Sequence, residues 1–420
     1  MRILVLHQFF LGANDPGGSR FNELTRFWSR RGHDVTVVTG NLHHGTGRVD
    51  PRFRRRWVAE ERLADGVRVL WCYVPRSYMH GYLGRFFGYV AFMVSSTLAT
   101  LVYAGPQDVV IASSPPLTIG LNAWFIAAIK RIPFVFEIRD LWPEFAIEMG
   151  VLRNPILIKL AYALERFIYR RANRINVLTP AFRRHLTAKK GIEEGRIIHI
   201  PNGADLSLFR PGPKDNWVRE KHGWGGRFVA IYVGAHSKAN YLWQLFDAAE
   251  ALREHPDILL ALVGDGNERR QLAAEAARRR LPNLQMIGAQ PKKIIGDFIN
   301  AADVGVAVLK KVDGFKTVYP NKIFDYMSCA RPVLTCIDGE ARRIVEEAGA
   351  GLFAEPEDPR AFRDAILKLQ ADPDAAARAG SSGYEYVKKN FSREALATRY
   401  AEELEGLCGI RRLAAAEAKT

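Results

Sequence analysis

The sequence has few cysteines, and their spacing excludes both a disulfide framework and a zinc module. The four cysteines, Cys72, Cys329, Cys336 and Cys408, form no CxxC pair and lie at no metal-binding spacing from a histidine. We therefore expect reduced, core-packed cysteines in a cytosolic protein.

Three other absences narrow the function. No G-x-G-x-x-G fingerprint is present, which disfavours a nicotinamide cofactor. The one Asp-x-Asp, at residues 372–374, lies between predicted helices, so we interpret it as a helix N-cap turn and expect no divalent metal and no cofactor. The net charge is +15, yet the chain lacks an RNP-like signature and zinc-finger spacing, so nucleic acid is not an expected partner.

The first ten residues, MRILVLHQFF, do not suit a signal peptide. His7 and Gln8 interrupt the apolar run, and no small-residue cleavage pattern follows. This segment is instead predicted to be a first buried strand that leads into a glycine-containing loop.

Length and patterning predict two α/β domains. A chain of 420 residues exceeds one ordinary core, and 48% hydrophobic with 25% charged residues is typical of a globular protein. We expect a Rossmann-like domain in residues 1–205, a second in residues 206–390, and a C-terminal helix and tail in 391–420 that returns toward the first. The two domains are expected to face each other across a cleft.

Short runs rich in β-branched and aliphatic residues, separated by helical patterns, predict a parallel sheet in each half. In the first half these runs are residues 2–7, 35–39, 67–73, 108–113, 133–138, 175–178 and 196–200. In the second half they are residues 228–233, 258–263, 284–287, 304–308 and 333–336.

Basic charge is concentrated in the first half, beside apolar segments. Residues 1–205 hold 28 Lys and Arg against 16 Asp and Glu, a net charge of +12. Residues 51–57 form a cationic cluster with aromatics, and residues 86–102 carry no charge. Two interpretations stay open for residues 78–103: an interfacial helix on an anionic membrane, or a buried helix of the first domain.

Residues 320–332 carry the strongest candidate site. Pro320 is predicted to start a helix that presents Asn321, Lys322 and Asp325 near its N-terminus. Lys322 and the free amides suit a nucleoside diphosphate, and Asp325 suits ribose hydroxyls. The alternative is a plain helix that feeds a buried strand.

Further candidates follow predicted strands, where ligands bind in such sheets. Small residues that admit a ligand, and donors that suit phosphate, define these substrate-binding candidates: Gly17, Gly18, Arg20, Asn202, Gly234, His236, Lys238, Gly264 and Gly266. Taken singly, each of these turns is also consistent with an ordinary strand-to-helix connection.

Residues 137–144 concentrate charge just beyond an apolar strand. Unpaired charges there are costly, so they either pair internally, as Arg139 with Glu144, or line a functional cleft. We favour the cleft, with Asp140 at the reacting centre. Arg139 is a second catalytic candidate, and Glu144 and Glu148 are candidates for orienting acceptor hydroxyls.

With these motifs in order, the chain resembles the family-4-type retaining glycosyltransferases of GT-B fold. Within them it is similar to the fucosamine and amino-sugar transferase branch of bacterial surface polysaccharide synthesis. The matching segments are residues 15–20, 32–40, 109–116, 133–144, 200–205, 263–266 and 320–332. Two departures stand out: Thr317 and Asp325 occupy the positions of the family's glutamate pair, and His236 and Lys238 lie in the segment that replaces its usual Arg and Lys.

The resemblance implies a UDP-sugar, here with an N-acetylamino sugar, held mainly by the C-terminal domain. It also implies a polyprenyl-diphosphate-linked or other saccharide acceptor held by the N-terminal domain, with retention of configuration and no metal. We expect O-antigen or capsule synthesis at the inner face of the cell membrane. The alternatives are a sugar-nucleotide epimerase or phosphorylase on the same fold, and a non-catalytic sugar-nucleotide-binding assembly partner.

Overall fold

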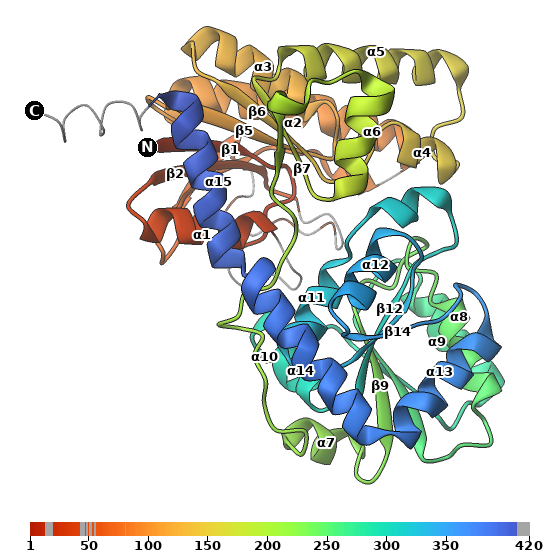
Figure 1. Ribbon diagram of the computed structural model, residues 1–420. Coiled ribbons are helices and arrows are strands. Elements are labelled where there is room, and N and C mark those ends of the chain that lie inside the picture. Colours follow the sequence, from red (N-terminus) through yellow and green to blue (C-terminus); the bar gives the residue numbers. More distant parts are fainter. Residues whose placement is uncertain are drawn as a thin grey trace, which may run out of the picture. The chain divides into compact units, whose positions relative to one another are not determined.

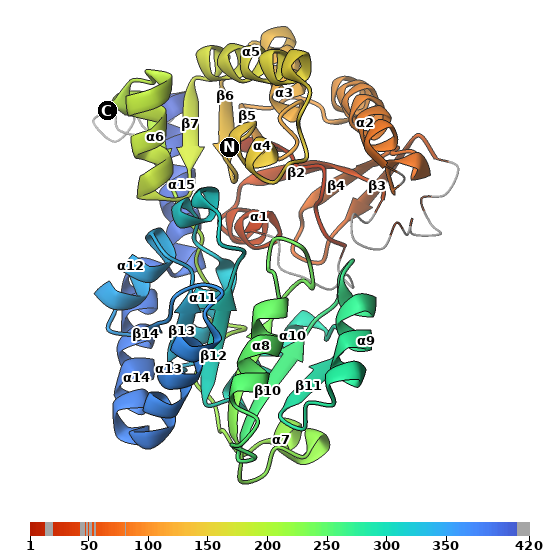
Figure 2. The ribbon, with the colours of Figure 1, turned by 90° about the vertical axis from the view of Figure 1, so that its right-hand side faces the viewer.

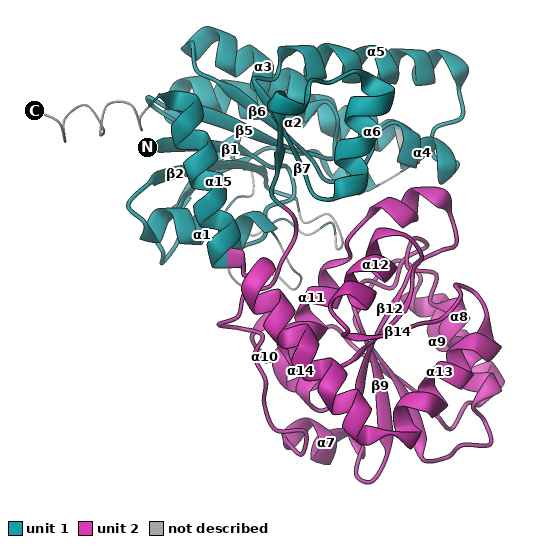
Figure 3. Ribbon diagram, in the orientation of Figure 1, with its two compact units in different colours: residues 1–13, 19–200, 394–420 teal, residues 14–18, 201–393 magenta. Residues whose placement is uncertain are grey.

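The computed structural model describes residues 1–12, 20–42, 47, 49, 53, 56–79 and 81–409. These residues form two α/β units (Figure 3). Unit 1 holds the described residues up to Ile200 together with residues 394–409, and unit 2 holds residues 201–393. Each unit is built on its own sheet, which confirms the predicted pair of parallel-sheet halves.

The sheet of unit 1 has eight strands in the order β3-β4-β2-β1-β5-β6-β7-β8, parallel except for the β3–β4 pair (Figure 1). The strands are β1 (Arg2–Leu6), β2 (Asp34–Gly40), β3 (Val58–Arg62), β4 (Arg68–Cys72), β5 (Val109–Ser114), β6 (Phe134–Ile138), β7 (Arg174–Val177) and β8 (Ile197–His199). Its helices are α1 (Arg20–Arg30), α2 (Gly81–Tyr103), α3 (Ile119–Lys130), α4 (Glu144–Glu148), α5 (Pro155–Arg171), α6 (Pro180–Lys190) and α15 (Arg393–Cys408).

Helix α15 belongs to the core of unit 1 although it comes last in the chain. Leu396, Tyr400 and Leu404 are buried with Trp28 of α1 and strand residues of the sheet. The indole of Trp28 donates a hydrogen bond to the carbonyl of Ala397 at 2.8 Å. Strand β1 and helix α15, the first and last described elements of the chain, are therefore packed into one core.

The sheet of unit 2 has six parallel strands in the order β11-β10-β9-β12-β13-β14 (Figure 2). They are β9 (Phe228–Val233), β10 (Ile258–Val263), β11 (Leu284–Ile287), β12 (Val304–Val308), β13 (Val333–Cys336) and β14 (Gly351–Phe353). The helices are α7 (Trp217–His222), α8 (Trp243–Ala251), α9 (Arg269–Arg279), α10 (Lys292–Asn300), α11 (Asn321–Ser328), α12 (Glu340–Glu347), α13 (Pro359–Ala371) and α14 (Pro373–Asn390).

Several detailed predictions are confirmed. The five strands predicted in the second half coincide with β9 to β13. Asp372 caps α14, since its side chain accepts a hydrogen bond from the amide of Ala375. The four cysteines are unpaired thiols. Strands β3 and β14 were not predicted.

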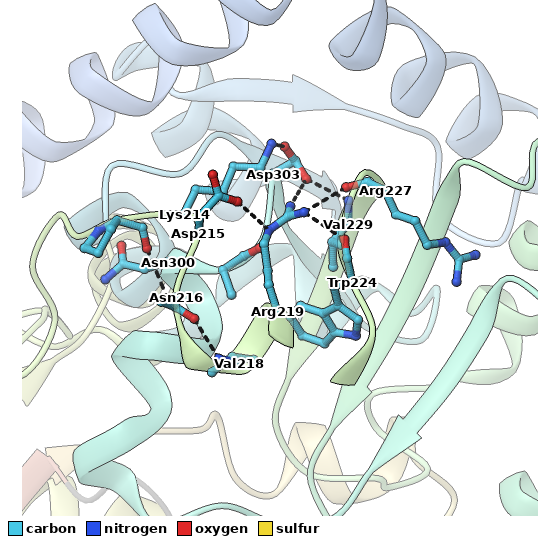
Figure 4. A network of polar contacts seen from close by, with 12 residues as sticks. Lys214, Asp215, Asn216, Val218, Arg219, Trp224, Arg227, Val229, Asn300 and Asp303 are labelled. Atoms are coloured by element: carbon cyan, nitrogen blue, oxygen red, sulfur yellow. Dashed lines mark hydrogen bonds and ion pairs between the residues drawn. The ribbon is translucent and has the colours of Figure 1, made fainter. Parts of the chain in front are cut away.

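The amino edge of the second sheet is closed by a buried ion-pair network (Figure 4). Arg219 of α7 pairs with Asp303 at 2.8 Å and donates to the carbonyl of Ala301 at 2.9 Å. Asp303 also accepts a hydrogen bond of 2.8 Å from the amide of Val229, which lies at the start of β9. These groups satisfy one another's charges and hydrogen bonds, so the network stabilises the amino edge of the sheet. The carboxyl edge is therefore the candidate ligand site.

Candidate functional site

In unit 2 the strand order reverses between β9 and β12, and ligands bind beyond the carboxyl ends of strands at such a reversal. The two strands pair only through Ala230–Val304 and Ile231–Gly305 and then diverge. Tyr326 of α11 fills the gap, because its hydroxyl accepts from the amide of Val233 at 2.9 Å and donates to the carbonyl of Val306 at 3.1 Å.

Glycine at position 305 is what lets α11 approach this closely. A Cβ built on Gly305 would lie 2.2 Å from the ring of Tyr326, nearer than any real contact. The ring therefore rests on bare backbone, and α11 is fixed against β9 and β12. Its N-terminus consequently lies at the carboxyl edge of the sheet.

The N-terminus of α11 is built as predicted, with Pro320 at the N-cap and Asn321 as the first helical residue. Within the described part of the chain, no side-chain capping bond is made at this N-terminus. Among the described residues, the buried Oδ1 of Asn321 has no hydrogen-bond partner. An uncapped helix N-terminus with an unsatisfied polar atom beside it is suited to bind a ligand that carries negative charge and hydroxyls.

Lys322 is held over the end of β9. Its Nζ lies 3.9 Å from the ring centroid of Tyr232 and 3.2 Å from Oδ1 of Asn240. A Cβ added at Gly234 would lie 3.2 Å from the same Nζ, so the absence of a side chain at Gly234 leaves space for the amine. Burial lowers the pKa of Lys322 to about 7, against the opposing effect of Asp325 one turn along the helix.

A lysine whose pKa is lowered by burial gains stability in its charged form when an anion binds beside it. The folded protein holds the amine where its charge is poorly solvated, and a bound phosphate would restore the charged form. Asn321, Lys322 and Asp325 all lie on α11, and Nζ of Lys322 lies against Gly234. Their roles toward a diphosphate and a ribose stay predictions. The contacts of Tyr232 and Asn240 with Lys322 were not predicted. A tyrosine in a strand looks like an ordinary core residue, and a single asparagine in a loop belongs to no recognisable motif.

The loops after β9 and β10 are bonded directly to each other. The amide of His236 donates to the carbonyl of Asp265 at 2.9 Å, and that of Glu268 donates to the carbonyl of His236 at 3.0 Å. A Cβ on Gly264 would lie 1.9 Å from the Gly234 carbonyl oxygen, and one on Gly266 would lie 2.3 Å from that of His236. Glycine is therefore required at both positions because neighbouring backbone lies against them, whereas the sequence predicted that they make room for a ligand.

The imidazole of His236 is buried between these loops. Burial lowers its pKa to about 4, so the ring is neutral at physiological pH. Neither ring nitrogen has a hydrogen-bond partner among the described residues. Lys238 is exposed on the same loop, and Asn202 donates to the carbonyl of Tyr319 at 3.3 Å, just before α11.

In unit 1, Arg20 differs from its prediction. Its side chain is 0% exposed and pairs with the equally buried Glu137, at 3.1 Å, and it donates to the carbonyl of Ile200 at 2.7 Å. Asn176 donates to the same carboxylate at 2.9 Å. The assignment of Arg20 to a phosphate is therefore corrected: its charge is compensated within the core of unit 1.

Arg139 and Asp140 follow β6 and are partly exposed at its carboxyl end. Burial raises the pKa of Asp140, and the neighbouring Arg139 opposes this effect. Glu144 does not pair with Arg139 as the internal alternative proposed. It bonds to Lys190 at 2.5 Å with His185 at 3.5 Å, and although burial opposes them, these partners lower its pKa to about 2. Gly17 and Gly18 lie outside the described residues.

The chain matches two known protein families, one in each half. Residues 17–203 match the glycosyl transferase 4-like domain, and residues 215–386 match the glycosyl transferases group 1 family. The two matches are consecutive and together span most of the chain. The chain belongs to the group 1, family 4-like glycosyltransferases.

One relative of this glycosyltransferase is the Escherichia coli K12 protein WcaI, whose name describes a glycosyl transferase of colanic acid biosynthesis. It is 20% identical over 403 residues, which cover 93% of this chain and 96% of WcaI. The structure of sucrose-phosphate synthase from Thermosynechococcus elongatus matches with a TM-score of 0.75 at 20% identity, covering 99% of each chain. Anabaena HepE, solved with UDP-glucose, matches with a TM-score of 0.71 at 19% identity, covering 97% of this chain and 100% of HepE. The predicted GT-B fold is confirmed.

Proposed function

We propose that this glycosyltransferase moves a sugar from a UDP-sugar, an N-acetylamino sugar in our prediction, to a lipid-linked saccharide during surface polysaccharide synthesis, with retention of configuration and without a metal. The observation that carries the proposal is Lys322, a half-buried lysine beside the uncapped N-terminus of α11 at the strand reversal of unit 2. WcaI, named for colanic acid biosynthesis, supports the polysaccharide assignment, and HepE, solved with UDP-glucose, supports the donor class.

In the proposed reaction, the bond between the anomeric carbon and the diphosphate oxygen breaks, and a bond from that carbon to the acceptor hydroxyl oxygen forms. Negative charge grows on the leaving diphosphate, where Lys322 and the α11 amides would stabilise it. The hydroxyl proton passes to the leaving phosphate on the same face of the sugar, which gives retention. Asp325 would bind ribose, and Asn321 and His236 would offer hydrogen bonds to the donor.

The acceptor side is assigned to unit 1. Asp140 and Arg139 at the end of β6 would position the acceptor hydroxyl, because they are partly exposed and no ion pair within the described chain engages either one. Glu144 is already bonded to Lys190 and its second carboxylate oxygen is buried, so we expect it to shape the loop and not to contact the acceptor directly.

The experiment that tests the function has two steps. Nucleotide sugars are first screened by thermal stabilisation, in which a ligand of the folded state raises the melting temperature by mass action. UDP release is then measured with the best donor, with and without a polyprenyl-diphosphate-linked saccharide. UDP release that requires the acceptor supports a transferase.

The same assay separates the alternatives. An epimerase converts the donor with no acceptor and no UDP release, and a phosphorylase requires inorganic phosphate. A non-catalytic binding partner is stabilised by the donor but converts none of it under any condition. Each of these results would overturn the proposed transfer.

UDP binding is expected to weaken above pH 7. The free Lys322 amine has a pKa of about 7, and a bound diphosphate raises it, so binding takes up a proton above that pH. Below pH 7 the amine is charged in both states and contributes no pH dependence. We expect the dissociation constant to rise up to about tenfold per pH unit between pH 7 and 9.

Isothermal titration calorimetry in two buffers of different ionisation enthalpy measures both the affinity and the proton uptake. The Lys322→Arg variant is the control, because its guanidinium stays charged throughout this range and the pH dependence should vanish. A dissociation constant that is flat from pH 7 to 9 in the unmodified protein would contradict the prediction.

A further inference from the structure

Helix α2 carries a continuous stripe of exposed apolar side chains. Phe86 and Phe87 are 59% and 60% exposed. The stripe continues along the helix at intervals of three or four residues, and its members are Leu83, Phe87, Val90, Val94, Leu98 and Val102. Soluble surfaces seldom leave so many large apolar groups in contact with water.

The opposite face of α2 is packed into unit 1. Phe92, Ser96 and Thr100 are buried, and the amide of Asn122 on α3 donates to the hydroxyl of Ser96 at 2.7 Å. The segment Leu83–Tyr103 is long and apolar enough to cross a membrane by length and composition. In this structure one face of the helix is packed on the unit and the other is exposed, so it is neither wholly buried nor detached. The membrane interpretation of residues 78–103 stays a prediction.

Helices α3 and α5 extend this surface, and Figure 2 shows them with α2 along the same side of unit 1. Trp124 of α3 and Phe167 of α5 join them edge to face at 4.9 Å. The exposed apolar side chains that these helices add are Phe125, Ile129, Ile156, Leu157 and Leu160. Within the described part of unit 2, Trp217 alone is a large hydrophobic side chain exposed to this degree.

The charges on these three helices are almost all positive. Helices α2 and α3 contain no Asp or Glu, and the single acidic residue of α5, Glu165, is buried and bonded to Lys190 at 2.8 Å. The cations of the three helices are Arg85, Lys130, Lys159, Arg166, Arg170 and Arg171. On α5, Lys159, Arg166 and Arg170 form a row beside the apolar row of Ile156 and Leu160, which is the pattern of a helix that lies at a membrane interface.

Two cavities flank this basic row. One of about 530 Å³ and one of about 460 Å³ both have Arg166 and Arg170 in their walls. Lys189 of α6 also borders the larger cavity. None of these three cations forms an ion pair with a carboxylate in the described part of the chain, so they are available to an external anion.

We propose that the α2–α3–α5 face docks on an anionic phospholipid bilayer, with its apolar side chains in the headgroup boundary and Arg166 and Arg170 against lipid phosphates. A second copy of the chain is a poor occupant, because two such faces would bring like charges together. The Arg-rich segment at residues 51–57 carries no part of this proposal, since Arg52, Arg54 and Arg55 lie outside the described residues and Phe53 is buried against Trp71. The proposal rests on the proposed function in one respect: docking would bring the enzyme to a lipid-linked acceptor.

The test is co-sedimentation of the full chain with vesicles of phosphatidylcholine alone or with one quarter phosphatidylglycerol. We expect binding to the anionic vesicles that weakens with salt. Arg166→Gln/Arg170→Gln should weaken it by about thirtyfold, since one cation near an anionic leaflet contributes about fivefold. Phe86→Ser/Phe87→Ser should weaken it at least about tenfold through the lost apolar contact.

Arg270→Gln/Arg360→Gln is the matched control, because it removes two exposed charges from unit 2. UDP affinity and the thermal midpoint are measured for each variant, so failure of the donor site or of folding is distinguished from failure of docking. No binding to anionic vesicles, or equal loss in the control, overturns the proposal. A dimer in solution that Phe86→Ser/Phe87→Ser dissolves would assign the face to a second copy and also overturn it.

Discussion

Replacing Lys322 with alanine is expected to lower the turnover number by about a hundred- to a thousandfold, the usual cost of losing one donor to a developing anion. The amine lies beside the uncapped start of α11 and over the ring of Tyr232, where the proposed leaving diphosphate gains charge. Because this charge grows in the transition state, the loss should fall mainly on turnover and less on donor affinity.

Stability separates this role from a structural one. The folded pKa of Lys322 is about 7, below the ordinary value of 10.5, so the charged amine destabilises the folded state fully below pH 7 and progressively less up to about pH 10. Removing the amine at pH 7 should therefore leave the thermal midpoint unchanged or raised.

The measurements are steady-state kinetics with saturating acceptor and thermal unfolding at pH 7. Lys368→Ala is the matched control, since this exposed lysine of α13 makes the same change of charge away from the site. Turnover close to that of the unmodified enzyme would remove Lys322 from the mechanism. A collapse of the thermal midpoint would show that its role is to hold the fold.

The second large effect concerns stability. Glu137→Gln should cost about 3–5 kcal/mol, because it removes the buried carboxylate that pairs with the guanidinium of Arg20. Both side chains are 0% exposed, so solvent does not screen the loss. For a unit of this size the thermal midpoint should fall by about 10 °C.

Glu60→Gln is the comparison. Glu60 also pairs with an arginine through two hydrogen bonds, with Arg68 at 2.8 Å for each, but its side chain is 48% exposed. Such a surface pair contributes only about 0–1 kcal/mol. Calorimetry that finds equal shifts for the two variants would refute the account of Arg20.

The same variant tests the corrected role of Arg20. At a temperature where Glu137→Gln remains folded, UDP affinity should be unchanged, since Arg20 is bonded within unit 1 and the donor site is built in unit 2. A parallel loss of affinity would restore the phosphate assignment made from the sequence.

The strand framework could be predicted because parallel strands are buried on both faces and thus consist of unbroken apolar runs. Strand β10, Ile258–Val263, is buried at every position and coincides with its prediction. Strand β3, Val58–Arg62, was missed because it lies at the sheet edge and carries three charged residues. Strand β14 was missed because three residues are too short to show a period.

The α11 motif was also visible locally, since Pro320 marks a helix start and residues three apart lie on adjacent turns of a helix. The sequence by itself therefore determined the two α/β units and the placement of Lys322 and Asp325 on one helix end. Only the tertiary structure decided that Tyr232 and Asn240 hold Lys322, that Glu137 neutralises Arg20 and that α2 exposes one apolar face. These outcomes depend on contacts between residues up to 117 positions apart, whose packing and desolvation leave no periodic trace in the chain.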